Sequence, residues 1–443
     1  MKKLYRSKIL LLLLGLLLGA ALAACAATGP GAAVPGSPGT AVQPPAGAAE
    51  ETPEQNPDSA ASGPAAPDPE AGTAAPPGYT EITLAAAGDV LVHNTIYLGA
   101  WDAAAGSYDF RPQYRSVAPL LSSADFAVVD LETTMGGPGF SYSGYPCFNS
   151  PDELAAALKD AGIDAVTAAN NHRMDTGRKG FFHTIETARA SGLEILGVRA
   201  AETELPCYIR DIKGVRLAFI NFSYCGRSVD GGKNFNGLPL PLDMTNLVNG
   251  FVPEEGAAAA AAEIGAVVDR ARELGARGFI VFLHWGYEYQ RQPNDFQREL
   301  ARLLVEQGVT AIIGGHPHVI QSAEVLPGPA GVRVPVFYSL GNFISDQRLE
   351  TLDNIHTEQG MIAWLKLRGY ADGRVEAAEA WYDPTWVMKH YEGGRSVYAI
   401  IPSLPALAAP GDYPFLSAAE LERIRTGVRQ TEELIPPLDL SPP

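Results

Sequence analysis

The sequence predicts an α/β fold in which helices cover mixed β-sheets. Short apolar runs of strand length alternate with stretches of helical periodicity between about residues 80 and 400. In addition, residues 207–222 form two strand-like runs around Lys213-Gly214, which predicts an antiparallel hairpin and therefore both strand directions. This span of about 320 residues is long enough for one large domain.

The first 24 residues have the pattern of a secretory signal peptide. Basic residues precede an apolar run at 9–22, and small residues at 23–24 lead to Cys25. The apolar run is shorter than the roughly 20 residues of a stable transmembrane helix. This ending resembles the lipobox of bacterial lipoproteins, which implies a lipid on Cys25 and an extracytoplasmic chain anchored to the bacterial cell membrane. An uncleaved anchor helix with an incidental cysteine is the alternative.

Residues 25–79 are rich in Ala, Pro and Gly and have no apolar periodicity, which predicts a disordered tether. The end-to-end distance of such a tether is roughly 5 to 6 Å times the square root of its number of residues. The folded domain would therefore lie about 40 Å from the membrane. At the other end, residues 401–443 predict an amphipathic helix at 417–431 and a Pro-rich tail. The folded domain is therefore expected at 80–400.

Within this domain the pattern predicts each element in turn. The expected buried strands are 82–87, 126–130, 165–168, 217–222, 279–283, 311–313 and 336–339. The expected helices are 151–161, 177–190, 254–274 and 294–307. Ser150 is the expected N-cap of the first helix, with Pro151 at its first position. Residues 361–367 and 375–382 predict a further antiparallel pair.

Charge and cysteine content limit the function classes. The net charge of -17 excludes a nucleic-acid partner, because phosphate binding requires a basic face. Apart from Cys25, the cysteines are Cys147, Cys207 and Cys225, an odd number that allows one disulfide and one free thiol. Their spacing does not define a pairing.

Polar side chains follow the ends of five predicted strands. They are Asp89, then Asp130 and Glu132, then Asn170, Asn171, His172 and Asp175, then His284, and finally His316 and His318. Because open α/β sheets collect ligands at the carboxyl ends of their strands, these side chains are expected to meet at one edge. Nitrogen and oxygen donors of this kind suit Mn, Zn or Fe better than Ca. The alternative is a hydrogen-bonded loop edge, in which Asn170 and Asn171 cap a helix.

His316 and His318 are the most specific of these residues. They follow Gly314-Gly315, and a His-x-His pair on an extended segment places both imidazoles on the same side, as chelation requires.

The order of these motifs resembles that of the calcineurin-like metallophosphoesterases. Their amino-acid sequences resemble those of the CapA family of poly-γ-glutamate capsule-synthesis proteins. The similarity covers roughly residues 82–345. Its motifs are Ala-Asn-Asn-His at 169–172, His-Trp-Gly at 284–286, Gly-His-Pro-His at 315–318 and Tyr-Ser-Leu-Gly-Asn-Phe at 338–343. The resemblance implies a layered α/β/β/α sandwich with mixed sheets and a site for one or two divalent ions.

The resemblance also implies roles for individual residues. Asp89 would bind a first metal and Glu132 would bridge, while Asn171 and His284 would bind a second metal, and His316 and His318 would divide between the two. His172 would be the general acid, held by Asp175. Two metals could then polarise a phosphoryl group and generate hydroxide.

Two departures from the calcineurin-like pattern weaken the first metal position. Leu91 stands where the usual Asp-x-His motif has histidine, and Glu132 replaces the bridging aspartate. His93 could reach the site if the loop turns, although a surface or supporting role fits it better. The first metal position is therefore expected to be weak or empty, which would leave a single ion and would not support the standard two-metal route.

Several residues near the motifs are candidates for substrate binding, namely Asn170, Trp285, Glu288 and Asn342. Trp285 could equally pack the end of its strand, and Asn342 follows a glycine as turn residues often do. His183, His356 and His390 lie outside the motifs and are expected to be surface or packed residues.

Two function classes follow from these patterns. The first is a metal-dependent hydrolase that acts on a phosphoester or another bond of a cell-surface polymer such as poly-γ-glutamate. The second is a non-catalytic component of capsule assembly or export, in which the pocket binds polymer or organises the partners of a capsule-synthesis complex.

Overall fold

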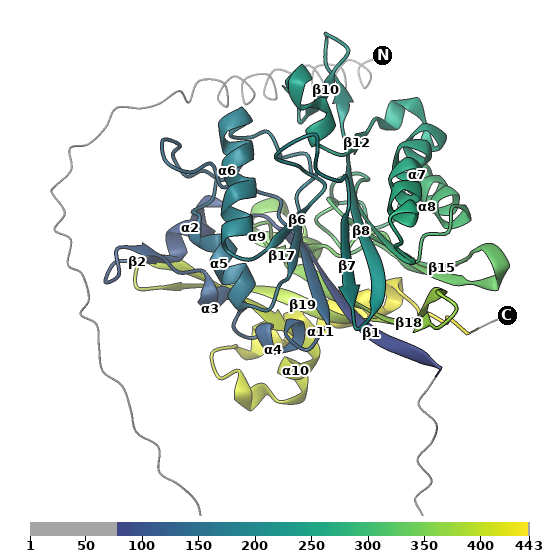
Figure 1. Cartoon of the computed structure of the whole chain (residues 1–443). Coiled ribbons are helices and arrows are strands. Elements are labelled where there is room, and N and C mark those ends of the chain that lie inside the picture. Colours follow the sequence, from purple (N-terminus) through teal and green to yellow (C-terminus); the bar gives the residue numbers. More distant parts are fainter. Residues whose placement is uncertain (1–77, 442–443) are drawn as a thin grey trace, which may run out of the picture.

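Two mixed β-sheets form the centre of the chain in this computed structural model, which describes residues 78–441 (Figure 1). The predicted signal peptide, Cys25 and the tether up to residue 77 lie outside the described residues. Within the described range, no helix is long and apolar enough to cross a membrane.

The first sheet has the strand order β20-β19-β18-β1-β4-β5-β6, with β17 beside β1. Its strands are β1 (Tyr79–Val90), β4 (Phe126–Asp130), β5 (Ala165–Thr167), β6 (Glu194–Leu196), β17 (Asn342–Ile344), β18 (Gln359–Tyr370), β19 (Val375–Glu392) and β20 (Arg395–Pro402). Strands β1, β4, β5 and β6 are parallel, whereas β18, β19 and β20 continue the sheet in antiparallel pairs.

The second sheet has the order β12-β8-β13-β14-β16-β15, with β7 paired to β8. Its strands are β7 (Tyr208–Ile212), β8 (Val215–Tyr224), β12 (Gly250–Phe251), β13 (Gly278–His284), β14 (Ala311–Gly315), β15 (Ala323–Pro327) and β16 (Arg333–Phe337). The predicted hairpin is confirmed as β7 and β8, and Lys213 and Gly214 both have positive φ, as its tight turn requires.

Helices cover the outer face of each sheet (Figure 1). The first sheet is covered by α2 (Asn94–Gly99), α3 (Arg111–Tyr114), α4 (Ala118–Leu121), α5 (Glu153–Asp160) and α6 (Gly177–Ala190). The second is covered by α7 (Ala257–Glu273) and α8 (Asp295–Glu306). Alternate residues of β1 and β4 therefore pack in opposite directions, Ala85 against the helices and Leu84 against the second sheet. The predicted α/β/β/α sandwich with mixed sheets is confirmed.

The remaining elements lie at the ends and edges of this sandwich. They are the β2–β3 hairpin (Trp101–Asp102, Ser107–Tyr108), the small sheet β9 (Gly226–Arg227), β10 (Lys233–Phe235) and β11 (Leu238–Pro239), and the helices α9 (Leu349–Leu352), α10 (Ser403–Ala408) and α11 (Ala418–Leu434). Short 3-10 turns lie at Leu242–Leu247, Pro253–Glu255, Pro329–Gly331, Ile355–Glu358 and Pro410–Asp412. Ser417 caps α11, which packs with α10 on β19 through a separate apolar cluster that includes Trp386 and Ile424.

The expected N-cap at Ser150 is wrong. Helix α5 begins at Glu153, with Asp152 at the cap position. The Ser150 hydroxyl is instead 2.8 Å from Thr133 Oγ1, and its amide donates to the Thr134 carbonyl. Ser150 thus connects the loop after β4, which carries Glu132, to the segment before α5.

Candidate metal centre

The strand ends that the sequence singled out meet at one edge of the sandwich, between the two sheets. In the first sheet, Asp89 of β1 lies opposite Asp130 of β4, which lies opposite Thr167 of β5. In the second, His284 of β13 lies opposite Gly315 of β14. Parallel strands bring these carboxyl ends to the same level, and the face-to-face packing of the sheets places the acidic set against the histidines.

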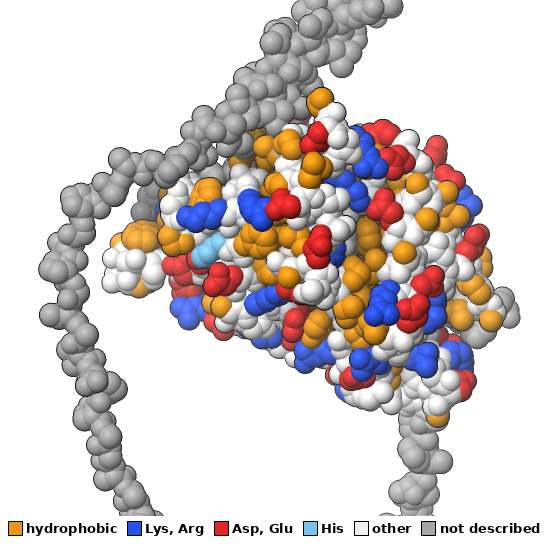
Figure 2. All heavy atoms as spheres, turned by 45° about the horizontal axis from the view of Figure 1, so that its top comes forward, with side chains coloured by type: hydrophobic (Ala, Val, Ile, Leu, Met, Phe, Trp, Pro, Cys, Tyr) orange, Lys and Arg blue, Asp and Glu red, His pale blue; other side chains and the backbone are white. Residues whose placement is uncertain are grey.

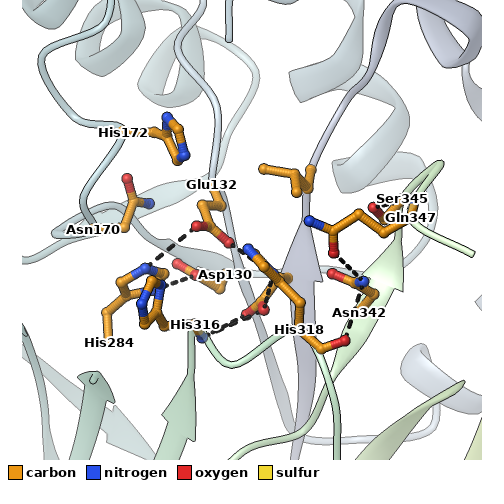
Figure 3. A network of polar contacts seen from close by, with 12 residues as sticks. Asp130, Glu132, Asn170, His172, His284, His316, His318, Asn342, Ser345 and Gln347 are labelled. Atoms are coloured by element: carbon orange, nitrogen blue, oxygen red, sulfur yellow. Dashed lines mark hydrogen bonds and ion pairs between the residues drawn. The ribbon is translucent and has the colours of Figure 1, made fainter. Parts of the chain in front are cut away.

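Glu132 lies at the middle of this cluster (Figure 3). The Glu132 side chain is fully buried, and neither carboxylate oxygen has a hydrogen-bond partner among the described residues. His284 Nε2 is 3.4 Å from Oε1, and His318 Nδ1 is 3.7 Å from Oε2. A buried carboxylate without hydrogen bonds is costly unless a cation balances it, so this position suits a metal ligand.

Two groups of side chains could each hold a metal ion, and Glu132 belongs to both. One group is Glu132, His316 and His318, and the other is Asp89, Asp130, Glu132 and His284; within each, one ligand atom per residue lies within 4.8 Å of the others. The imidazole and carboxylate donors fit a divalent transition metal. The buried Nδ1 of His316 also lacks a hydrogen-bond partner in the described chain, which leaves it available as a ligand.

Asp130 belongs to this site, although the sequence interpretation gave it no role. Its Oδ2 lies 3.0 Å from His284 Nδ1, and its Oδ1 accepts a 2.7 Å hydrogen bond from Thr167 Oγ1. His284 Nε2 in turn lies 2.7 Å from Asn171 Oδ1. The position of Asp130 at the end of a buried strand, two residues before Glu132, is the feature that could have identified it as part of the site.

The two histidines of the His-x-His motif do not lie on an extended segment, so that part of the prediction is wrong. His316 has φ 96° and His318 has φ 57°, in the left-handed region that costs non-glycine residues energy. This turn nevertheless brings the imidazoles together, with ring centroids 5.8 Å apart, and places His318 Nδ1 3.0 Å from Asp89 Oδ2.

The glycines before the motif allow a close approach to Asp89. A Cβ atom on Gly315 would lie 2.6 Å from Asp89 Oδ1, which is too close for any other residue. The next amide, that of His316, lies 3.3 Å from both Asp89 oxygens. Gly315 therefore allows the histidine turn to pack against the first sheet.

His172 and Asp175 form a hydrogen-bonded pair beside the centre. His172 Nδ1 is 2.7 Å from Asp175 Oδ2, which also accepts a 2.6 Å hydrogen bond from the Phe148 amide. In Figure 3 the His172 ring lies on the far side of Glu132 from the other histidines. The neighbouring Asn170 and Asn171 do not cap α6, whose N-cap is Thr176; Asn170 donates to the Leu131 carbonyl instead.

The buried charges shift the histidine pKa values strongly. Burial by itself lowers the pKa of His284, but the carboxylates of Glu132 and Asp130 outweigh it and raise this pKa to about 10. His318 behaves in the same way beside Glu132 and Asp89, with a pKa raised to about 9. Burial and the neighbouring His284 instead hold the pKa of His316 well below its usual value. Positive charge is therefore favoured where it contacts the carboxylates.

The predicted substrate-binding residues occupy different surroundings. Trp285 is fully buried, stacks on Tyr338 and donates to its carbonyl at 2.9 Å, so its indole supports the strand end. Glu288 is exposed and lines a cleft beside the centre. Asn342 opens β17 opposite Asp89 rather than lying in a turn, and its Nδ2 donates to the Thr357 carbonyl and to Gln347.

The other histidines lie apart from the candidate ligands. His93 Nδ1 lies 3.3 Å from the Asp346 amide, and its ring packs edge-on against Phe148, which packs edge-on against His172. His93 thus supports the aromatic packing behind His172. His183, His356 and His390 are paired elsewhere, with Asp152, Gln359 and Glu420. Cys207 and Cys225 are free thiols, so they form no disulfide with each other.

Two further residues of the centre were missed by the sequence interpretation. The Tyr224 ring lies 4.7 Å from the His316 ring, and Asn236 accepts a 3.3 Å hydrogen bond from Asn171 Nδ2. Asn236 has φ 48° at the tip of the β10–β11 hairpin, and the Asn-Gly pair at 236–237 is the pattern that could have indicated this turn.

The layered α/β/β/α fold holds a buried cluster of carboxylates and histidines between its sheets. This arrangement fits a metal-binding protein. The family model of the bacterial capsule synthesis protein PGA_cap matches residues 83–347, and the chain belongs to this family. The expected resemblance to capsule-synthesis proteins is thereby confirmed.

Two named relatives share part of the chain. The PGA biosynthesis protein CapA of Bacillus subtilis (strain 168) is 33% identical over 198 residues, which are 44% of this chain and 46% of that protein. The capsule biosynthesis protein CapA of Bacillus anthracis is 28% identical over 204 residues, 45% of this chain and 44% of that protein. The chain spans less than half the length of either relative.

Among solved structures, the calcineurin-like phosphoesterase YfkN from Bacillus subtilis matches 80% of this chain and 97% of its own, with 13% identity and a TM-score of 0.38.

Proposed function

We propose that this protein is a divalent-metal-dependent hydrolase that cleaves a phosphoester or related bond in a cell-surface polymer during capsule synthesis or export. The observation that carries the proposal is Glu132, a buried carboxylate with no hydrogen-bond partner in the described chain, placed between His284 and His318. The names of the two CapA relatives supply the capsule context.

The residues present fit a metal. Asp89, Asp130, Glu132, His284, His316 and His318 would hold one or two ions, with Asn171 Oδ1 as a further donor next to His284. Mn, Zn and Fe are the ions that such donors favour. Bound there, a divalent ion would polarise the scissile group and lower the pKa of a water molecule.

The other steps fall to side chains of this chain. Asp175 accepts the Nδ1 proton of His172, which orients the ring and leaves Nε2 to hold the proton for the departing oxygen. Burial by itself lowers the pKa of His172, but Asp175 outweighs it and raises this pKa above the usual value, so a protonated ring is favoured. Asp130 and Thr167 fix the orientation of His284 in the same manner.

The test is hydrolysis of a generic phosphodiester by the purified full-length chain with added manganese, together with its metal content by elemental analysis. We expect bound metal and activity, both lost in His284→Ala and His318→Ala and retained in His183→Ala, which removes a histidine paired with Asp152 away from the centre. A purified protein without stoichiometric metal or activity would support the non-catalytic alternative.

We also propose that the protein acts outside the cytoplasm, held to the membrane by a lipid on Cys25. Support comes from the basic start, the apolar run and the small residues before Cys25. Expressed in a bacterial host, the wild-type chain should partition with membranes and Cys25→Ser should be released into the soluble extracytoplasmic fraction. Identical fractionation of the two would contradict the lipid anchor.

A further inference from the structure

Asn236 is an exposed residue at the tip of the β10–β11 hairpin, and its side chain contacts the candidate metal centre. Its Oδ1 accepts a 3.3 Å hydrogen bond from Asn171 Nδ2, and its Nδ2 lies 3.5 Å from His172 Nε2. The hairpin turn does not use this side chain, because the Gly237 amide donates to Asn234 Oδ1 instead. Both hydrogen-bond contacts of the Asn236 amide in the described chain therefore belong to the centre.

The hairpin is anchored close to its tip. The Phe235 side chain is fully buried in the apolar cluster that covers the first sheet. Lys233 Nζ contacts the Gly250 carbonyl and lies 2.9 Å from Glu263 Oε2. Asn236 has φ 48°, a left-handed conformation that Asn tolerates better than most residues. The anchored hairpin therefore sets where the Asn236 amide lies.

The orientations of the two amides depend on each other. Asn171 Oδ1 lies 2.7 Å from His284 Nε2, so in the proposed function this oxygen faces the metal position and Nδ2 faces Asn236. A side-chain amide has one oxygen and one NH2 group, so Asn236 turns its oxygen to Asn171 and its NH2 group to His172. These contacts connect a candidate metal ligand with the general acid.

Two hydrogen-bond donors thus lie side by side. The proposed mechanism places a proton on His172 Nε2, and Asn236 Nδ2 carries two more. Because the two nitrogens are 3.5 Å apart, one oxygen can lie within hydrogen-bond distance of both. Two donors cannot bond to each other, so an acceptor oxygen is the partner that satisfies both.

The cleft beside the centre brings substrate to this position. Asn236 lines this cleft, which has a volume of about 480 Å³ and also contacts the candidate ligand His316. The described lining contains no Lys or Arg, and Figure 2 shows basic and acidic side chains interspersed on the face it presents, without a continuous basic stripe. A neutral amide therefore takes the place of a basic side chain beside His172.

We propose that Asn236 is a catalytic residue whose Nδ2 donates to the departing oxygen that His172 protonates, while its Oδ1 orients Asn171. In this step a water oxygen bonds to phosphorus and releases one proton to solvent. The bond from phosphorus to the departing oxygen breaks with its electron pair on that oxygen, which takes the proton of His172 Nε2. Asn236 exchanges no proton and stabilises the developing charge. The inference rests on the proposed hydrolytic function.

The test compares two esters that differ in their leaving group, with the full-length chain and manganese. The ester p-nitrophenyl methyl phosphate releases a stable phenolate, whereas p-nitrobenzyl methyl phosphate releases an alkoxide that needs a proton. Asn236→Asp keeps the acceptor for Asn171 and tolerates positive φ, but it loses the donor. We expect its kcat to fall about 100-fold on the nitrobenzyl ester and less than about tenfold on the nitrophenyl ester. His172→Ala should also lose more activity on the nitrobenzyl ester.

Metal binding provides a readout that needs no turnover. Asn236→Gly removes the whole side chain without strain at positive φ, so Asn171 loses the acceptor that orients it. Its affinity for manganese, measured by titration of the metal-free protein, should fall about tenfold. Asn236→Asp should bind manganese as the wild-type chain does. Asn246→Asp is the matched control in both experiments, because it makes the same change at an exposed amide that contacts Glu202.

Equal losses of Asn236→Asp on the two esters would overturn the inference, because they would mean that the amide only shapes the site. An unchanged kcat on the nitrobenzyl ester, or wild-type manganese affinity in Asn236→Gly, would overturn it as well. These outcomes leave the proposed function intact. Hydrolysis of neither ester by the wild-type chain would instead count against the proposed function, and the role of Asn236 in the reaction would fall with it.

Discussion

Asp130 Oδ2 lies 3.0 Å from Nδ1 of His284, and Thr167 holds the other oxygen of the same carboxylate. Two consecutive contacts thus run from β5 through β4 to β13, across the boundary between the two sheets. Such support of a histidine ligand fixes its ring orientation and raises its basicity.

Replacing Asp130 by Asn should therefore weaken metal binding by at least about 10- to 100-fold, because it removes both a candidate metal ligand and the carboxylate partner of His284. Titration of the metal-free protein with manganese or zinc measures this directly. Asp211→Asn, which removes an exposed partner of Arg216, serves as the control. Unchanged affinity in Asp130→Asn would show that Asp130 neither binds the metal nor supports His284.

Glu132→Gln should abolish metal-induced stabilisation, because it removes the negative charge common to both candidate ligand groups. A ligand at about 100 times its Kd stabilises the folded state by about 2.7 kcal/mol, which is visible as a rise in Tm. Thermal melts with and without manganese should show this rise in the wild-type chain and not in the variant. Equal rises in both proteins would place the metal elsewhere.

His172→Ala should lower the rate of phosphodiester hydrolysis about 100- to 10,000-fold, the range of a lost general acid. Metal content should remain at the wild-type level, since His172 belongs to neither candidate ligand group. The rate of Asp175→Asn should lie between those of the wild-type chain and His172→Ala, because the ring stays in place but loses the carboxylate charge that favours its protonated form. Loss of metal from His172→Ala would assign this residue a ligand role instead.

Asp346 provides a pH-dependent prediction away from the metal centre. Burial by itself raises the pKa of Asp346, but hydrogen bonds from Lys389, Tyr398 and Thr95 outweigh it and lower this pKa below 3.8. Lys389 Nζ lies 2.6 Å from Oδ1, and Thr95 Oγ1 lies 2.8 Å from Oδ2. A folded-state pKa below the unfolded value stabilises the protein above the unfolded pKa, and the contribution is lost as pH falls through the folded pKa.

Asp346→Asn should consequently lower the free energy of unfolding by about 1.5 to 3 kcal/mol at pH 7, the range for hydrogen bonds to a charged group. The difference from wild type should narrow as pH drops below 3.8. Urea unfolding at several pH values checks both statements, with the exposed Asp372→Asn as control. A difference that stays constant down to pH 3 would mean that the Asp346 charge contributes nothing.

The sequence pattern predicted secondary structure best where the residues of a single element define its type and its ends. The run at 126–130 corresponds to β4, and the periodic stretch at 177–190 corresponds to α6. Strand β20, by contrast, was not predicted, and β19 extends to Glu392, well beyond the expected end at 382. The Gly-Gly pair at 393–394, both with positive φ, marks the turn between them and could have indicated the hairpin.

The order of the polar residues at the strand ends could be read from the sequence, because strand propensity, glycine turns and ligand chemistry are local properties of the chain. Which of these residues meet depends on how the two sheets pack. Asp89 and His318 are separated by 229 positions, and they come together because two sheets pack face to face. The position of Glu132 between histidines of the opposite sheet, the support of His284 by Asp130, and the cleft beyond His316 all depend on that packing.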